Sequence, residues 1–137
     1  MNQPLSERLS YHIELLRQVQ QRLQRAADND SQLIAAEILQ QLEQVIEQLV
    51  QRTDSAYQDG QDWLMSILTH QPQLTPTINR DLLWFFGGDC LHFMTDAEIE
   101  LFQQLDEQEA EHDVSQGPFD RAAVKTLLQQ NADTFDA

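Results

Sequence analysis

The sequence predicts an all-α fold: a single bundle-like domain of five or six helices that begins with a long antiparallel helical hairpin. Three observations support this prediction. Apolar residues recur every three or four positions over residues 5–52, a spacing that places them on one face of a helix. Proline and glycine divide the rest of the chain into pieces that suit shorter helices. Nowhere do apolar and polar residues alternate for long enough to indicate a strand.

The hairpin is predicted from two apolar patterns. The first helix covers about residues 5–27, with one narrow stripe made of Leu5, Leu9, His12, Leu16, Val19, Leu23 and Ala26. Asp28 to Ser31 form a turn, in which Asp30 or Ser31 can cap the second helix, about 32–52. That helix carries two apolar rows (Ala35, Ile38, Leu42, Val45 and Leu49; Ile34, Leu39, Ile46 and Val50), so we expect it to pack on more than one neighbour.

Two shorter helices should follow. Residues 53–60 either extend the second helix or form a loop, and Asp59 or Gly60 precedes a third helix over about 61–70. Its inward residues are Trp63, Leu64, Ile67 and Leu68. A proline-containing linker leads to a fourth helix over about 76–86, with Thr75 as its cap and Pro76 in its first position.

The last part of the chain has the clearest helix start. Thr95-Asp-Ala-Glu98 matches a capping box, so a fifth helix should run from Asp96 to about His112. Ile99, Phe102 and Leu105 point inward on it. A sixth helix is predicted over about 121–131, with Val124, Leu127 and Leu128 on its apolar face, and residues 132–137 as a frayed tail.

Composition limits the class of protein. A chain of 137 residues and 15.9 kDa corresponds to one domain, residues 1–137, and can bury a core without disulfides. The lone Cys90 excludes an intrachain disulfide and every zinc pattern with several cysteines. There is no signal-peptide pattern at the start, and the longest apolar run is Leu82–Phe86, so we expect a soluble, cytoplasmic protein with no membrane partner.

Charge excludes one class of partner. The net charge is −15, which disfavours nucleic acid because phosphate binding needs clustered Lys and Arg. Residues 1–53 carry five Arg against seven acids, whereas residues 54–137 carry three bases against sixteen acids. The stretch from Asp89 to Asp113 holds nine acids and no base, so it is a solvated face, a surface that steers a basic protein partner, or an imitation of a nucleic-acid backbone.

The segment 81–94, DLLWFFGGDCLHFM, holds one of the two tryptophans, three of the six phenylalanines, two of the four glycines and the only cysteine. It is either the core of the domain or an apolar patch offered to a partner or ligand. The candidate interaction or pocket residues are Trp84, Phe85, Gly87, Gly88, Cys90, His92 and Phe93. The glycine pair follows an apolar helix rather than a strand, so it predicts a helix end or the floor of a pocket and not a phosphate loop.

Two patterns raise the question of catalysis or metal binding. Glu109 and His112 have the Glu-x-x-His spacing of di-iron bundles, and Asp89 and His92 could form a degenerate second pair. An exposed acidic helix end explains them as well. Cys90 with His92 suggests a nucleophile and its base, but residues i and i+2 of a helix do not face each other. We therefore expect no catalytic residue, no metal and no cofactor, and a hydrogen-bonded core histidine at His12.

The segment 81–94 also resembles a segment in a family of small uncharacterised gammaproteobacterial proteins. The resemblance implies a bacterial cytosolic setting and no particular activity.

The expected function is that of a non-enzymatic protein-interaction or regulatory module, most simply a homodimer. The stripe of the first helix and the aromatic segment are the candidate surfaces, and a basic protein is a candidate partner. The alternative is a small-molecule or metal-binding helical protein with a pocket around residues 84–93.

Overall fold

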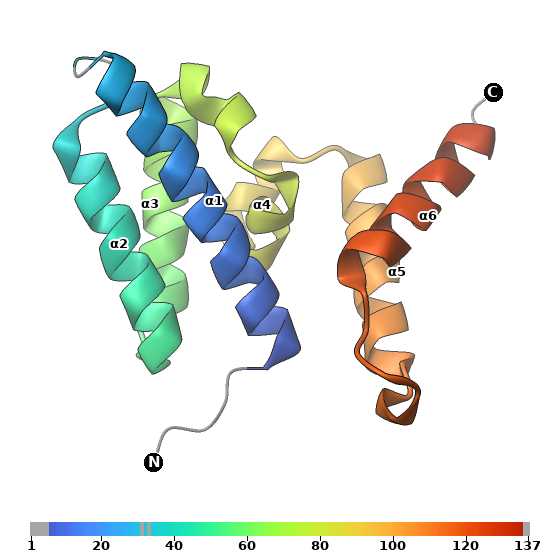
Figure 1. Ribbon diagram of the computed structural model, residues 1–137. Helices are drawn as coiled ribbons and strands as arrows, with labels where there is room; N and C mark the ends of the chain where they lie inside the picture. The colour runs from blue at the N-terminus through green and yellow to red at the C-terminus, as the bar shows by residue number, and fades with distance from the viewer. Residues whose placement is uncertain (1–5, 31, 33, 136–137) are drawn as a thin grey trace. The chain divides into compact units, whose positions relative to one another are not determined.

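The computed structural model describes residues 6–30, 32 and 34–135, and this part of the chain contains helices and no strand (Figure 1). The six α-helices are α1 (Glu7–Asn29), α2 (Ala36–Gln51), α3 (Ala56–His70), α4 (Arg80–Phe86), α5 (Asp96–Glu111) and α6 (Arg121–Phe135). Three short 3₁₀ helices join them: η1 (Pro72–Thr77), η2 (Gly88–Phe93) and η3 (Val114–Gln116). The all-α prediction is confirmed, and the six α-helices among the described residues match the five or six helices predicted.

The chain forms two compact units, Met1–His92 and Phe93–Ala137. The prediction of one domain over residues 1–137 stays a prediction, and each unit is described by itself. Across the described residues, no helix combines the length and the apolar character that crossing a membrane requires.

In the first unit, α1 packs on α2, α2 on α3, α3 on α4 and α4 on α1 (Figure 1). The N-terminal hairpin is therefore confirmed, and α4 completes the bundle. The predicted stripe of α1 is buried at His12, Leu16, Val19 and Leu23, and Ile13 and Leu15 are buried too. The stripe is wider than the spacing predicts because α1 packs against both α2 and α4. Leu5 lies outside the described residues.

Several predicted boundaries in this unit are wrong. The helix α2 begins at Ala36, after an Ala35 cap that makes no side-chain hydrogen bond, and Asp30 instead accepts a hydrogen bond from the Gln32 N–H within the turn. Ser31 lies outside the described residues. The helix α3 begins at Ala56, so Gly60 lies inside it. Both errors arise because short polar turns have no periodic signal of their own.

The start of the fourth helix is also later than predicted. Pro76 lies in η1, whose turn is closed by hydrogen bonds from the Thr77 hydroxyl to the Leu74 carbonyl and from the Ile78 N–H to the Thr75 carbonyl. Ile78 then adopts an extended conformation, and Asn79 precedes α4. The predicted break after Phe86 is confirmed, because Gly87 and Gly88 both have positive φ.

The second unit is a hairpin of α5 and α6, which pack against each other (Figure 1). Its capping box is confirmed: the Thr95 hydroxyl accepts from the Glu98 N–H at 3.1 Å, and the Glu98 carboxylate accepts from the Thr95 N–H at 3.1 Å. Phe102 and Leu105 are buried as predicted, whereas Leu127 is 59% exposed. The helix α5 ends at Glu111 and α6 continues to Phe135, beyond the predicted end; residues 136 and 137 lie outside the described part.

Candidate functional site

The aromatic segment contributes mainly to the core of the first unit. Phe85, Phe86 and Cys90 are buried, Trp84 is partly exposed and Phe93 is 41% exposed. The Phe85 ring stacks on the His12 ring with centroids 4.3 Å apart and lies 5.3 Å from the Tyr57 ring. Phe85 thus packs α4 against α1 and α3. This agrees with the interpretation of the segment as core rather than as an apolar patch.

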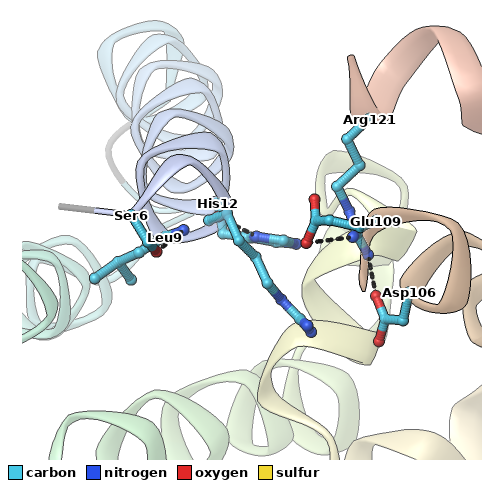
Figure 2. A network of polar contacts seen from close by, with 7 residues as sticks. Ser6, Leu9, His12, Asp106, Glu109 and Arg121 are labelled. Atoms are coloured by element: carbon cyan, nitrogen blue, oxygen red, sulfur yellow. Dashed lines mark hydrogen bonds and ion pairs between the residues drawn. The ribbon is translucent and has the colours of Figure 1, made fainter. Parts of the chain in front are cut away.

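His12 is a buried histidine held by its own helix. Its Nδ1 lies 2.7 Å from the Arg8 carbonyl oxygen, one turn earlier on α1 (Figure 2). A carbonyl only accepts, so Nδ1 carries the proton in this contact. The prediction of a hydrogen-bonded core histidine is confirmed.

The glycine pair is packed against a glutamine. The Gln61 side-chain amide donates to the Phe86 carbonyl at 3.3 Å and to the Gly87 carbonyl at 3.2 Å. A Cβ added to Gly88 would lie 2.1 Å from Gln61 Nε2. The space over Gly88 is therefore filled by the glutamine that satisfies the end of α4, and no side chain larger than hydrogen fits there without moving Gln61.

Cys90 and His92 lie in different environments. Cys90 is fully buried, and burial together with the nearby Asp89 and Asp62 carboxylates raises the pKa of its thiol to about 11. The His92 side chain is 82% exposed and lies 4.0 Å from an Asp89 oxygen. A nucleophilic cysteine needs a lowered pKa and access to substrate, and the geometry of Cys90 gives it neither.

The residues of the candidate metal pair have separate partners. Glu109 lies 3.6 Å from the Arg121 guanidinium. His112 follows the end of α5 rather than lying within it, its Nε2 is 2.8 Å from the Gly117 carbonyl oxygen, and its ring packs edge-on against Phe119. Within residues 6–30, 32 and 34–135, no three His, Cys, Asp or Glu side chains gather as a metal site would need.

A buried arginine is the main feature that the sequence did not predict in the second unit. The Arg121 side chain, at the start of α6, is 2% exposed and donates to Asp106 at 2.9 Å (Figure 2). With Glu109, this makes a pair of α5 carboxylates around one guanidinium. Asp106 and Glu109 thus belong to the fold of the hairpin, and Glu98 belongs to the capping box. The other six of the nine acids in the stretch 89–113 are exposed, and one of these six, Asp113, accepts a hydrogen bond from the Ser115 N–H at 2.9 Å.

A pocket of about 560 Å³ lies where the start of α1, the end of α2 and the start of α3 meet. We call it the hairpin-end pocket. Its lining residues are Ser6, Leu9, Leu49, Arg52, Thr53, Asp54, Ala56 and Tyr57. Ser6 is fixed there as the cap of α1, accepting from the Leu9 N–H at 3.1 Å (Figure 2).

Two features distinguish this pocket from an ordinary surface depression. Tyr57 is 50% exposed although its ring lies 5.3 Å from the Phe85 ring, so an exposed aromatic residue lines the pocket. Arg52 has φ 56° and ψ 42°, a left-handed conformation that favours glycine. Sequence reasoning missed this pocket because its lining comes from three helix ends, each of which looks like an ordinary polar turn.

Comparison with family models identifies the family to which the chain belongs. Residues 4–137 match the model described as PA2817-like. The chain belongs to the PA2817-like family. The match extends the resemblance of residues 81–94 to almost the whole chain, and the family is uncharacterised. Searches of curated proteins and of solved structures found no match.

In this member of the PA2817-like family, the groups available to a partner or ligand are those left exposed on the surface. The apolar stripe of α1 and most of the aromatic segment are used inside the first unit. The large apolar side chains that remain exposed among the described residues are Val50, Tyr57, Phe93 and Leu127. Of these, only Tyr57 lines the hairpin-end pocket.

Proposed function

We propose that the protein is a non-enzymatic interaction module that receives an apolar side chain of a protein partner in the hairpin-end pocket. The observation that carries the proposal is the combination of apolar lining residues with a half-exposed tyrosine in one pocket. Leu9, Leu49 and Ala56 are the apolar lining residues, and Tyr57 is the half-exposed tyrosine. Tyrosine is enriched at protein interfaces because a large apolar ring and a hydroxyl bind at a small cost in conformational entropy.

The local backbone supports the same interpretation. A left-handed arginine costs free energy relative to glycine, on the order of 1 kcal/mol. Strained backbone that a chain retains is often found at functional sites. Arg52 is also one of the lining residues of the pocket.

The proposal can be tested without knowing the identity of the partner. A photoreactive benzoylphenylalanine replaces Tyr57, and products formed in living cells are identified by mass spectrometry. Gln58 is the matched control position, because it is the next residue of α3, is exposed and does not line the pocket. A Thr53→Trp change fills the pocket from an exposed position without touching the core.

The proposal requires one defined cross-linked product when the photoreactive residue is at position 57. This product must disappear with Thr53→Trp and must not form when the photoreactive residue is at position 58. Products that form equally at both positions, or that survive Thr53→Trp, would show random collision instead. The homodimer expected from the sequence belongs to this proposal. Light scattering tests it, since a monomer has a mass of 15.9 kDa and a dimer twice that.

The proposal has two further parts. The protein is located in the cytoplasm, and the exposed carboxylates of residues 89–113 steer a basic partner toward it. Asp89, Asp96, Glu100, Glu107, Glu111 and Asp113 are the exposed acids concerned. Such steering acts on the association rate and is screened by salt. An association rate that does not fall between low and high ionic strength would remove this part alone.

A small apolar ligand in the same pocket is the second candidate function. Its volume of about 560 Å³ lies within the range of about 300–1,000 Å³ that small-molecule sites occupy. Native mass spectrometry of freshly purified protein separates the two functions. A retained mass of a few hundred daltons that is lost with Thr53→Trp supports the ligand, and an unmodified chain mass supports the protein partner.

A further inference from the structure

The exposed side of the N-terminal hairpin carries a groove that shares no lining residue with the hairpin-end pocket. The helices α1 and α2 run side by side in opposite directions (Figure 1). The groove between them has a volume of about 410 Å³ and is lined by Gln20, Gln21, Gln24, Leu39, Gln40 and Glu43. Val50, which is 42% exposed, lies about three turns after Leu39 and so on the same side of α2. We call the exposed side of residues 14–28 and 36–51 the outer hairpin face.

The outer hairpin face carries positive charge on one helix and negative charge on the other. Arg17 and Arg25 are exposed on α1, and Glu37 and Glu47 are exposed on α2. In the part of the chain that the structure describes, none of these four side chains has an ion-pair partner. The four charges are therefore available to a second molecule.

A hydrogen bond between the two helices shows which of these charges lie at the same height along the hairpin. Gln20 Nε2 donates to Glu43 Oε2 at 2.5 Å, so these two residues are level. Each residue advances a helix by about 1.5 Å, and α1 and α2 run in opposite directions. Arg17 is three residues before Gln20 and Glu47 is four residues after Glu43, so this pair of opposite charges is level to within one residue. The other pair of opposite charges is level in the same way, five residues after Gln20 and six before Glu43.

A twofold axis parallel to the helices brings the level charges of two copies together. Rotation about this axis places α1 of each copy over α2 of the other without a change in height, and neighbouring helices then run antiparallel. Arg17 meets Glu47 of the second copy, and Arg25 meets Glu37 of the second copy. Since the same contacts occur twice, the dimer contains four such ion pairs.

The charges also distinguish this axis from the alternative twofold axis, which runs across the helices. The alternative axis stacks α1 on α1 of the second copy in opposite directions, so that Arg17 faces Arg25 and the two repel. The parallel axis avoids this repulsion. It places the remaining exposed acids of this part of α1 opposite uncharged residues of the second copy, Glu14 opposite Gln51 and Asp28 opposite Ala36.

The distribution of net charge favours the same part of the chain. Two copies that each carry a charge of −15 repel one another, and the repulsion is weakest where the charge is nearest to balance. Residues 1–53 carry five Arg against seven acids, whereas residues 54–137 carry three bases against sixteen acids. The outer hairpin face lies entirely within the balanced part.

We propose that two copies of the chain associate through the outer hairpin face, with Arg17 and Arg25 of each copy paired to Glu47 and Glu37 of the other. The contact also covers the apolar side chains of the face, Leu39 and Val50. This interface is separate from the hairpin-end pocket, and it rests on the homodimer that forms part of the proposed function. The expected dissociation constant is on the order of 100 μM or tighter, because the contact is mostly polar.

Sedimentation equilibrium of the full chain and of charge-reversed variants tests the interface. Arg17→Glu and Glu47→Arg each replace two of the four ion pairs by two contacts between like charges, so each should raise the dissociation constant at least about tenfold. The variant that carries both changes restores opposite charges. Its dissociation constant should return to within about threefold of the wild type. Both side chains are exposed, so the changes leave the core intact.

The two single changes also separate the interface from a general effect of net charge. Arg17→Glu lowers the net charge by two units from −15, and Glu47→Arg raises it by two units. A general effect would weaken association in the first variant and strengthen it in the second, whereas the proposal requires weakening in both. Asp62→Arg is the matched control, because Asp62 is exposed on α3 and the change in charge equals that of Glu47→Arg. Its dissociation constant should not rise.

The outcomes separate this proposal from the proposed function. A dimer whose dissociation constant is unchanged in both single variants would overturn the interface and leave the homodimer standing. A dimer that the combined variant does not restore would overturn the assigned pairing of Arg17 with Glu47. A wild-type protein that stays monomeric up to about 1 mM would overturn the interface and the homodimer together, while cross-linking from position 57 still decides on the hairpin-end pocket.

Discussion

Replacing Gly60 by alanine should destabilise the protein, although the same change in an ordinary helix stabilises it. Gly60 lies inside α3, where alanine is favoured over glycine by about 1 kcal/mol. However, a Cβ at this position would lie 2.1 Å from Phe86 Cε1, 2.6 Å from Cζ and 2.8 Å from Cδ1. Carbon atoms pack at about 3.5–4.0 Å, so the Phe86 ring would have to move by more than about 1 Å.

The ring has little freedom to make that movement. Phe86 is 6% exposed and its ring lies edge-on to Phe85, with centroids 5.0 Å apart. Overpacking a core costs about 1–3 kcal/mol, and the closeness of three ring atoms places this case in the upper half. After the helix gain is subtracted, we expect a net loss of about 1–2 kcal/mol, which lowers the melting temperature by roughly 3–10 °C.

Thermal unfolding followed by circular dichroism measures this loss, and a double-mutant cycle tests its cause. Phe86→Leu removes part of the ring that meets the new methyl group. The variant carrying both changes should therefore be at least about 1 kcal/mol more stable than the sum of the single effects predicts. A Gly60→Ala protein that melts at or above the wild-type temperature, or two changes that simply add, would refute the reasoning.

Three further predictions concern a helix end, a cap and the thiol. Arg52→Gly should be more stable than Arg52→Ala by about 1 kcal/mol in urea unfolding, since both lack the side chain and only glycine suits φ 56°; equal stabilities would contradict the left-handed conformation. Thr95→Ala should cost about 1 kcal/mol whereas Thr95→Ser keeps the cap, so equal losses in the two proteins would show that the hydroxyl is not used. The folded Cys90 pKa of about 11 lies above the ordinary 9.0, so the unfolded chain loses its proton first as pH rises. The contribution of the Cys90 thiol to the free energy of unfolding is fully present below pH 9 and falls by up to roughly 3 kcal/mol towards pH 11. A Cys90→Ala protein whose stability has the same pH dependence as the wild type would refute this prediction.

Local signals account for the elements that the sequence predicted well. The hairpin of α1 and α2 follows from apolar spacing, and the start of α5 follows from Thr95 and Glu98, which are three residues apart. The end of α4 at the glycine pair is local as well, because positive φ is a property of single residues. These predictions needed no knowledge of which helices are neighbours.

The missed features depend on packing between distant parts of the chain. Gly60 looks like a helix boundary until Phe86 is known to fill the space beside it. Arg121 looks like a solvated residue at a helix start, and its ion pairs with Asp106 and Glu109 depend on the packing of α6 against α5. Pairings of this kind are set by tertiary structure, which the spacing of residues along one chain does not show.

The candidate site shows the same division. The sequence singled out residues 84–93 as core or as an interaction segment, and the structure buries Phe85, Phe86 and Cys90 of this segment. It did not suggest the hairpin-end pocket, whose residues Leu9, Arg52 and Tyr57 come from three separate helices. The level charges of the outer hairpin face were equally hidden, since the relative heights of α1 and α2 are known only from a hydrogen bond between the two helices.

The division of the chain into two units has a spectroscopic consequence. The protein has two tryptophans, Trp63 and Trp84, and both belong to the unit Met1–His92. Tryptophan emission therefore follows the unfolding of that unit, whereas circular dichroism at 222 nm follows the helices of both. Coincident denaturation curves from the two signals would mean that residues 1–137 unfold as one cooperative domain, and an early loss of ellipticity at constant emission would mean that the α5–α6 hairpin opens first.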